Sequence, residues 1–185
     1  MNKLIFIGGN RGVGKTSLAT HIRDEFKIPY VQYSEFNIQR AVEKFGRLDW
    51  NQLSEPENSN WVNNQFIEYV KESLGTGGRL LIDGHYSYYN SPPFTTDEFS
   101  EITSCGRTLA VLVTASLEDL FKRIEKDKRD RHLSIEKISE DVIWNRKMFE
   151  IYSSKTQVER YTLLNDELLS AQKRLREKVN LFLTD

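Results

Sequence analysis

The sequence predicts an α/β fold in which helices flank a five-stranded parallel sheet. Its apolar runs are strand-sized and continuous, as at 79–83, which is typical of parallel strands covered on both faces. These runs alternate with segments whose apolar residues recur every three to four positions, the period of a helix. A glycine-rich motif at 9–16 also joins the first run to the first helical segment.

Length and composition predict one globular domain over residues 1–185. The 26 Lys and Arg residues balance 27 Asp and Glu residues, which argues against a strongly basic nucleic-acid-binding protein. No apolar run approaches the roughly 20 residues of a membrane helix. Cys105 is the only cysteine, so no internal disulfide can form. We therefore expect a cytoplasmic protein with no membrane and no nucleic-acid partner, and leave an oligomer open.

The first half of the chain predicts two strands and three helices. In the first helix Leu18, Ile22 and Phe26 recur at spacing four. Glycines end the second and third helices. The predicted strands are 3–7 and 28–33, and the predicted helices are 16–26, 35–45 and 58–74.

The second half predicts three more strands, at 79–83, 108–114 and 161–164. A capping box at 116–119 opens a helix whose expected core face is formed by Leu117, Leu120, Phe121 and Ile124. Further helices are predicted at 134–152 and 168–182, a loop at 86–99 and a charged break at 126–132.

The motif Gly9-Asn10-Arg11-Gly12-Val13-Gly14-Lys15-Thr16 matches G-x-x-x-x-G-K-[ST] between a predicted strand and a predicted helix. Its glycines let backbone N–H groups converge on phosphate oxygens, and the helix N-terminus favours negative charge. Lys15 would reach the β- and γ-phosphates, and the Thr16 hydroxyl would ligate Mg²⁺. The motif predicts a P-loop NTP hydrolase fold that binds ATP and Mg²⁺. The predicted nucleotide-binding residues are Gly9, Asn10, Arg11, Gly12, Val13, Gly14, Lys15, Thr16 and Ser17, with Lys15 also catalytic.

Asp83 ends an apolar strand, where a carboxylate near Thr16 would support the metal. The alternative is an ordinary strand-ending Asp before Gly84. His85 follows and is either a site residue or a structural one.

Four aromatic residues in the predicted loop have two interpretations: they line a base or sugar pocket, or they pack over the sheet edge. They are Tyr86, Tyr88, Tyr89 and Phe94.

Two strand-end motifs resemble those of the archaeal-type adenylate kinases, and the chain is also similar to the nuclear adenylate kinase family linked to ribosome assembly. Tyr33-Ser34-Glu35-Phe36 stands where the archaeal-type family has Tyr-Gly-Asp-Phe, and Ile82-Asp83-Gly84-His85 where it has Ile-Asp-Thr-His. The resemblance implies a nucleoside monophosphate kinase with a helical nucleotide-binding insertion at 34–75 and a lid at 126–134. It implies acceptor binding by Ser34, Glu35, Arg40 and His85.

Arginines would supply the remaining positive charge. Arg129 and Arg131 lie in the expected lid and Arg146 in the next helix, where all three would stabilise the transferred phosphoryl group. The alternative for the lid charges is a solvated helix end. The resemblance implies that Arg123 stacks on adenine. The segment 48–57 departs from the family because it has no arginine to clamp an AMP phosphate.

These residues predict ATP- and Mg²⁺-dependent phosphoryl transfer to a nucleoside monophosphate, with AMP as the leading acceptor. The acceptor phosphate is already ionised at pH 7 and needs no general base. One alternative is a small-molecule kinase acting on a hydroxyl, with Asp83 or Glu35 as base. Another is an ATPase switch module that binds a protein partner.

Overall fold

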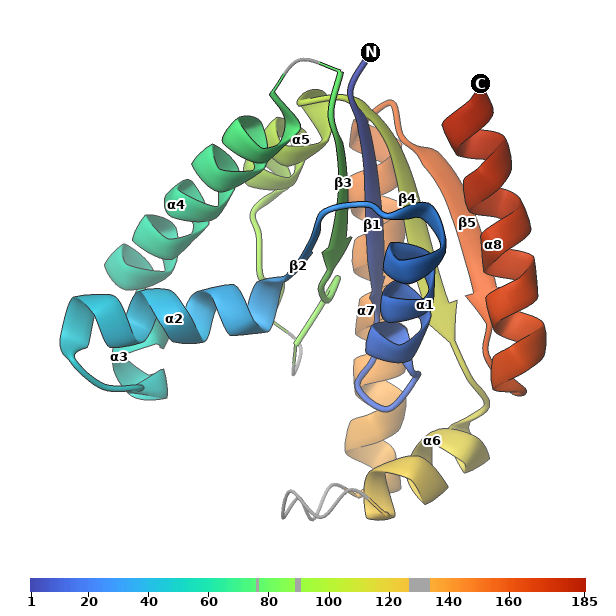
Figure 1. Cartoon of the computed structure of the whole chain (residues 1–185). Coiled ribbons are helices and arrows are strands. Elements are labelled where there is room, and N and C mark those ends of the chain that lie inside the picture. Colours follow the sequence, from blue (N-terminus) through green and yellow to red (C-terminus); the bar gives the residue numbers. More distant parts are fainter. Residues whose placement is uncertain (76, 89–90, 127–133) are drawn as a thin grey trace.

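Five parallel strands form one sheet in the order β2-β3-β1-β4-β5 (Figure 1). The computed structural model describes residues 1–75, 77–88, 91–126 and 134–185. The strands are β1 (Lys3–Gly9), β2 (Tyr30–Gln32), β3 (Arg79–Asp83), β4 (Arg107–Thr114) and β5 (Glu159–Leu164). This architecture confirms the predicted fold class.

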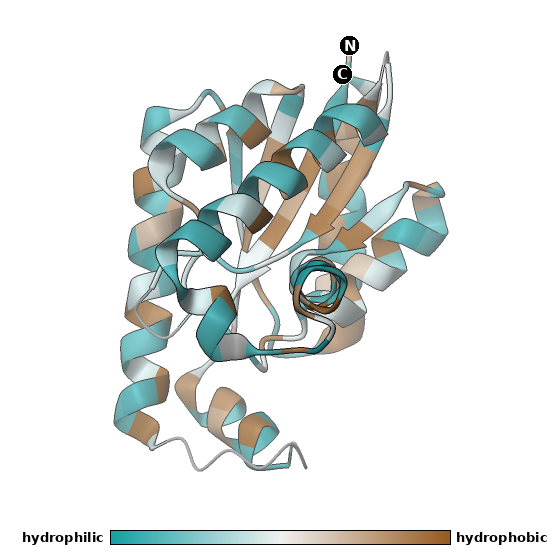
Figure 2. Cartoon of the chain, turned by 90° about the vertical axis from the view of Figure 1, so that its left-hand side faces the viewer, coloured by the Kyte–Doolittle hydropathy of each residue, from teal (hydrophilic) through white to brown (hydrophobic). Residues whose placement is uncertain are grey.

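Helices cover both faces of the sheet (Figure 1). α1 (Lys15–Phe26) and α8 (Leu168–Thr184) pack on one face, and α4 (Pro56–Leu74), α5 (Thr96–Ser104) and α7 (Ile135–Lys155) pack on the other. Successive residues of β1 alternate between the two cores, so that Ile5 and Ile7 join the first and Leu4 and Phe6 the second. Figure 2 shows the apolar strands enclosed by helices whose outer faces are largely hydrophilic.

A helical arm, residues 33–74, leaves the sheet after β2. It consists of α2 (Tyr33–Phe45), α3 (Trp50–Ser54) and α4, and its α2–α3 end projects away from the sheet (Figure 1). α6 (Leu117–Glu125) lies on the other side of the molecule, below the ends of the strands. The arm and α6 therefore flank the edge at which the parallel strands end, where α/β sheets bind their ligands.

The structure corrects the predicted loop at 86–99, because α5 begins within it at Thr96. Thr95 and Glu98 form a capping box, a local signal that the sequence carried. The second strand is also shorter than predicted, since Tyr33 is already the first residue of α2.

Burial decides two predictions about apolar side chains: the core face of α6 and the role of the aromatic residues after β3. Leu117 was expected on the core face of its helix but is 46% exposed, because α6 contacts the core mainly through Leu120 and Ile124. Tyr86 and Phe94 are fully buried and pack in the core rather than lining a pocket. Tyr88 is about half exposed, and Tyr89 lies outside the described residues.

No helix in the described ranges combines the length and apolar character needed to cross a membrane.

Candidate active site

The phosphate loop connects β1 to α1 and requires glycine by its backbone geometry. Gly12 and Gly14 adopt φ values of 78° and 85°, which side chains disfavour. A Cβ on Gly9 would lie 2.3 Å from the Val113 carbonyl oxygen. The loop is therefore packed closely against β4 and held in the curled shape that phosphate binding needs.

Lys15 is the first residue of α1 and its side chain turns back over the loop. Its Nζ donates a hydrogen bond to the Asn10 carbonyl, 2.7 Å away. Burial lowers the pKa of Lys15 to about 8, although the negative charges of Asp83 and Asp141 act in the opposite direction. The ammonium group is therefore buried beside the loop that would hold phosphate.

Thr16 and Asp83 come from different elements and meet directly. The Thr16 hydroxyl donates to Asp83 Oδ2 at 2.7 Å, and the Tyr30 hydroxyl donates to the same oxygen at 3.3 Å. The pairing of Ile7 in β1 with Asp83 in β3 places this carboxylate beside the loop. Burial raises the pKa of Asp83 above its ordinary value.

These oxygens fit Mg²⁺, a hard cation that prefers oxygen ligands and takes its other ligands from phosphates and water. A hydroxyl and a carboxylate beside a phosphate loop are the protein ligands that such a site uses. We therefore assign Thr16 and Asp83 as the residues that would hold the ion.

The loop after β3 carries His85 and is held by a residue of α7. Burial lowers the pKa of His85 well below its ordinary value, so the imidazole is neutral at pH 7. Its Nδ1 is buried without a hydrogen-bond partner among the described residues, and its ring packs edge-on against Tyr88. Asn145 of α7 exchanges two hydrogen bonds with the Ser87 backbone, both 3.1 Å, and so holds the loop that carries His85.

The predicted acceptor residues on the arm occupy α2. Ser34 accepts a hydrogen bond from Gln32, and Glu35 is exposed in the first turn. Arg40 donates to Glu43 at 2.6 Å and lies over the Phe36 ring, while its Nε is buried without a partner in the part of the chain that the structure describes.

Asn63 of α4 forms a polar link between the arm and the segment around the start of α5. Tyr33 donates to Asn63 Oδ1 at 2.5 Å. Asn63 in turn donates to the Pro93 carbonyl and to Glu98, both at 3.0 Å. The base of the arm is therefore tied to α5.

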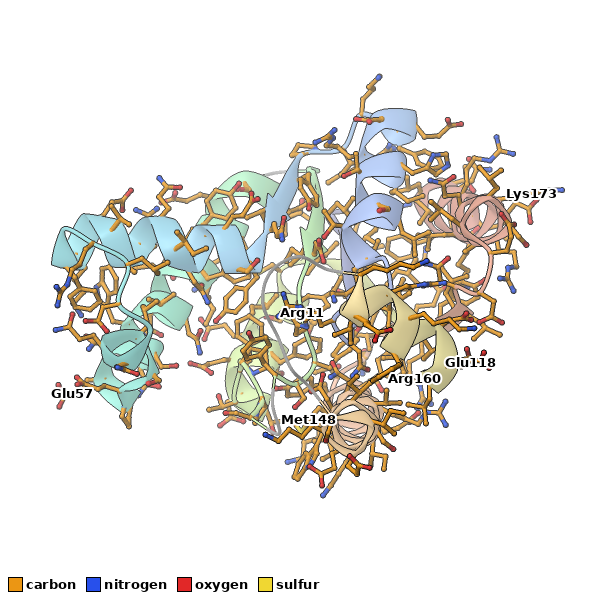
Figure 3. All side chains as sticks on the ribbon, turned by 90° about the horizontal axis from the view of Figure 1, so that it is seen from below. Arg11, Glu57, Glu118, Met148, Arg160 and Lys173 are labelled. Atoms are coloured by element: carbon orange, nitrogen blue, oxygen red, sulfur yellow. The ribbon has the colours of Figure 1, made fainter. Side chains whose placement is uncertain are left out.

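The predicted arginines fall in three places. Arg123 donates to the Asn165 carbonyl at 2.8 Å, so its guanidinium lies against the turn after β5. Arg146 lines a small cavity next to Asn10. Arg129 and Arg131, and most of the predicted lid, lie outside the described residues. Figure 3, viewed from below, shows Arg11 of the phosphate loop near the middle of this edge, between the arm and α6.

A family profile described as "AAA domain" matches residues 8–140. The chain belongs to the AAA domain family. No curated protein matches the sequence. This AAA domain has the P-loop kinase fold.

Three solved structures illustrate the fold. A shikimate kinase from Bacteroides thetaiotaomicron is 19% identical, with a TM-score of 0.66 over 97% of this chain and 99% of its own. A shikimate kinase from Acinetobacter baumannii, solved with shikimate, is 13% identical, with a TM-score of 0.61 over 100% and 93%. A sugar kinase from a Janibacter species is 13% identical, with a TM-score of 0.63 over 100% and 95%. At such identities the likeness shows the fold alone.

Sequence reasoning missed several residues that this AAA domain brings to the phosphate loop. Asn165 donates to the Val13 carbonyl at 2.7 Å and lies so close to Gly14 that a Cβ there would be 2.6 Å from its Nδ2. Asp141 accepts from Asn10 at 2.8 Å. Tyr30 reaches Asp83. No motif marks these residues, because each contact depends on how distant elements pack.

Proposed function

We propose that this AAA domain is an ATP- and Mg²⁺-dependent kinase that transfers the γ-phosphoryl group to a small-molecule acceptor. The observation that carries the proposal is the cluster of Lys15, Thr16 and Asp83 at the carboxyl edge of the sheet. The fold neighbours named as shikimate and sugar kinases support the same reaction class.

In this proposal the chain positions phosphates and neutralises charge. The N–H groups of the phosphate loop and the Lys15 ammonium stabilise the charge that develops during transfer. Mg²⁺, when bound, supplies further neutralisation of the phosphate oxygens. Arg123 would lie against adenine, and Arg146, Arg129 and Arg131 would approach the transferred group.

For the acceptor we propose a nucleoside monophosphate, with AMP first. Its support is the resemblance of the strand-end motifs to adenylate kinases and the position of Arg40. The Arg40 guanidinium has Nη donors beyond the one that Glu43 accepts, although its Nε is buried, with no partner among the described residues. A guanidinium with free donors is suited to phosphate oxygens. In this case the 34–75 insertion would bind the acceptor.

A second candidate acceptor is a small-molecule hydroxyl, which needs a general base. Two observations favour it. Arg40 and Arg47, the arginines of the arm, already pair with Glu43 and Asp49. The Glu35 carboxylate is exposed, whereas Asp83 is bound to Thr16 and Tyr30. Glu35 would then take the proton of the attacking hydroxyl.

The test is a coupled assay of ADP release from ATP, run with no acceptor, with AMP, CMP, UMP or GMP, and with shikimate and simple sugars. Stimulation by AMP above the basal rate supports the leading acceptor, and stimulation by an alcohol alone supports the second. ATP hydrolysis that no acceptor stimulates would contradict a kinase and favour an ATPase switch that binds a protein partner.

A further inference from the structure

One face of α7 contacts two loops of the site at once. Asp141 and Asn145 are four residues apart and therefore lie on the same side of this helix. Asp141 Oδ2 accepts a hydrogen bond of 2.8 Å from the side chain of Asn10, a residue of the phosphate loop. Asn145 exchanges two hydrogen bonds of 3.1 Å with the backbone of Ser87, a residue of the loop after β3.

The two α7 residues are also bonded to each other. Asn145 Nδ2 donates to the Asp141 carbonyl at 3.0 Å and approaches its carboxylate at 3.3 Å. Asn145 is 1% exposed and Ser87 is fully buried. Buried polar groups with fixed partners define one geometry, because any other arrangement leaves a donor or acceptor unpaired.

The two ends of this network are functional segments. The Asn10 carbonyl accepts a hydrogen bond from the Lys15 ammonium, so the residue that Asp141 holds is itself in contact with the proposed phosphate-binding lysine. Ser87 follows His85 by two residues, and Asp83 ends the strand from which this loop leaves. We propose that Asp141 and Asn145 are positioning residues that hold the phosphate loop and the loop after β3 at a fixed separation, so that bound ATP faces the acceptor.

This inference rests on the proposed function, since it assigns residues that arrange the proposed site. Two competing roles for Asp141 and Asn145 lead to different outcomes. Asp141 could act only through its negative charge near Lys15, or the contacts could serve stability alone. Replacement of the carboxylate by an amide removes the charge and keeps one oxygen that can accept from Asn10. Asn145 Nδ2 loses its 3.3 Å carboxylate contact but keeps the backbone carbonyl of residue 141 at 3.0 Å.

The experiment measures the dissociation constant of a fluorescent ATP analogue together with thermal melting. The variants are Asn10→Ala, Asp141→Ala, Asp141→Asn and the double variant Asn10→Ala/Asp141→Ala. We expect each alanine variant to weaken binding about tenfold, the size expected for a hydrogen bond to a charged group. The double variant should bind no more weakly than either single variant, because Asp141 acts through Asn10. Asp141→Asn should stay within about threefold of wild type.

Glu140→Ala is the matched control, since this exposed carboxylate precedes Asp141 on the same helix; it should bind like wild type. Multiplicative losses in the double variant, or an Asp141→Asn variant as weak as Asp141→Ala, would overturn the inference. So would melting shifts with unchanged affinity. If the wild-type protein binds no ATP, the proposed function and this inference are both overturned. If it binds ATP but the losses of the two single variants multiply in the double variant, the inference alone is overturned.

Asn145 is tested by hydrogen exchange of the peptide that contains Ser87. Asn145→Ala should speed exchange there while β1 and β4 stay protected. If the alanine variant does not fold, Asn145→Leu, which keeps the side-chain volume without a donor or acceptor, should give the same result. Exchange unchanged at Ser87, or raised equally throughout the chain, would show that Asn145 does not hold this loop in place.

Discussion

At the phosphate loop, side chains from distant elements bond to one another, whereas the two arginines of the helical arm pair with acids close to them in sequence. Thr16 contacts Asp83, 67 positions away, and Asn10 contacts Asp141, 131 positions away. On the arm, Arg40 pairs with Glu43 and Arg47 with Asp49. The groups of the proposed ATP site are therefore held by contacts between distant elements, whereas the arginines of the proposed acceptor side are held by pairs with nearby acids.

This difference separates what would determine phosphate binding from what would determine the choice of acceptor. The proposed phosphate site depends on a backbone conformation that requires glycine at a few positions. In the proposed function, acceptor binding would depend on side chains of the arm whose local ion pairs are individually weak.

The largest effect is expected from Lys15→Ala, which removes the charge beside the phosphates. We expect kcat to fall by at least about 100-fold, the scale of losing one charge-stabilising donor, with the fold retained. Steady-state kinetics and a thermal melt measure both. Lys173→Ala, an exposed lysine on α8, is the control and should be unaffected. ATP-dependent turnover close to wild type in Lys15→Ala would contradict the assignment of the loop.

Asp83→Asn should act on the metal rather than on the nucleotide. The amide keeps the size of the side chain but loses the negative charge that supports Mg²⁺. We expect the Mg²⁺ concentration for half-maximal rate to rise about tenfold or more, with a smaller change in binding of an ATP analogue.

Tyr30→Phe is the matched comparison for Asp83→Asn, because it removes one hydrogen bond to Asp83 and leaves the charge in place. Its Mg²⁺ titration should shift less. An unchanged titration in Asp83→Asn would remove this carboxylate from the metal site.

Arg40→Ala and Glu35→Gln separate the two acceptor classes. With AMP as acceptor, Arg40→Ala should raise the KM for AMP about tenfold, because a charged hydrogen bond to phosphate is lost, while Glu35→Gln changes little. With a hydroxyl acceptor, Glu35→Gln should lower kcat about 100-fold through loss of the base. Kinetics with saturating ATP measure both, and wild-type values in both variants would show that the first turns of α2 do not contact the acceptor.

The smallest effect concerns pH. The pKa of Lys15 is lowered to about 8 by burial, so its positive charge is present below pH 8 and is lost as the pH rises through that value. Affinity for ATP should therefore fall a few-fold between pH 7 and pH 9. Lys15→Arg keeps its charge throughout this range and should give a flat profile. A flat profile in the wild type would contradict the lowered pKa.

Local patterns in the sequence were sufficient to predict the phosphate loop and the strand that ends in Asp83. The eight residues of the phosphate-loop motif are consecutive, and an apolar strand ending in Asp83 is visible without a structure. The predicted parallel sheet follows from the same local patterns and is confirmed. The capping box at Thr95 was equally local, and α5 was missed because its signal lay inside a segment rich in Pro and Tyr.

Only the tertiary structure decided which distant groups meet. The sheet order places β3 next to β1 and so brings Asp83 to Thr16. Asp141 meets Asn10 across 131 positions, and Asn165 meets Val13 across 152. Each of these contacts depends on the rotation of a packed helix or turn, and a shift of one residue turns a helical side chain by about 100°. The periodicity of apolar residues predicts that a helix buries one face. It does not predict which polar group of another element the residues on that face will contact.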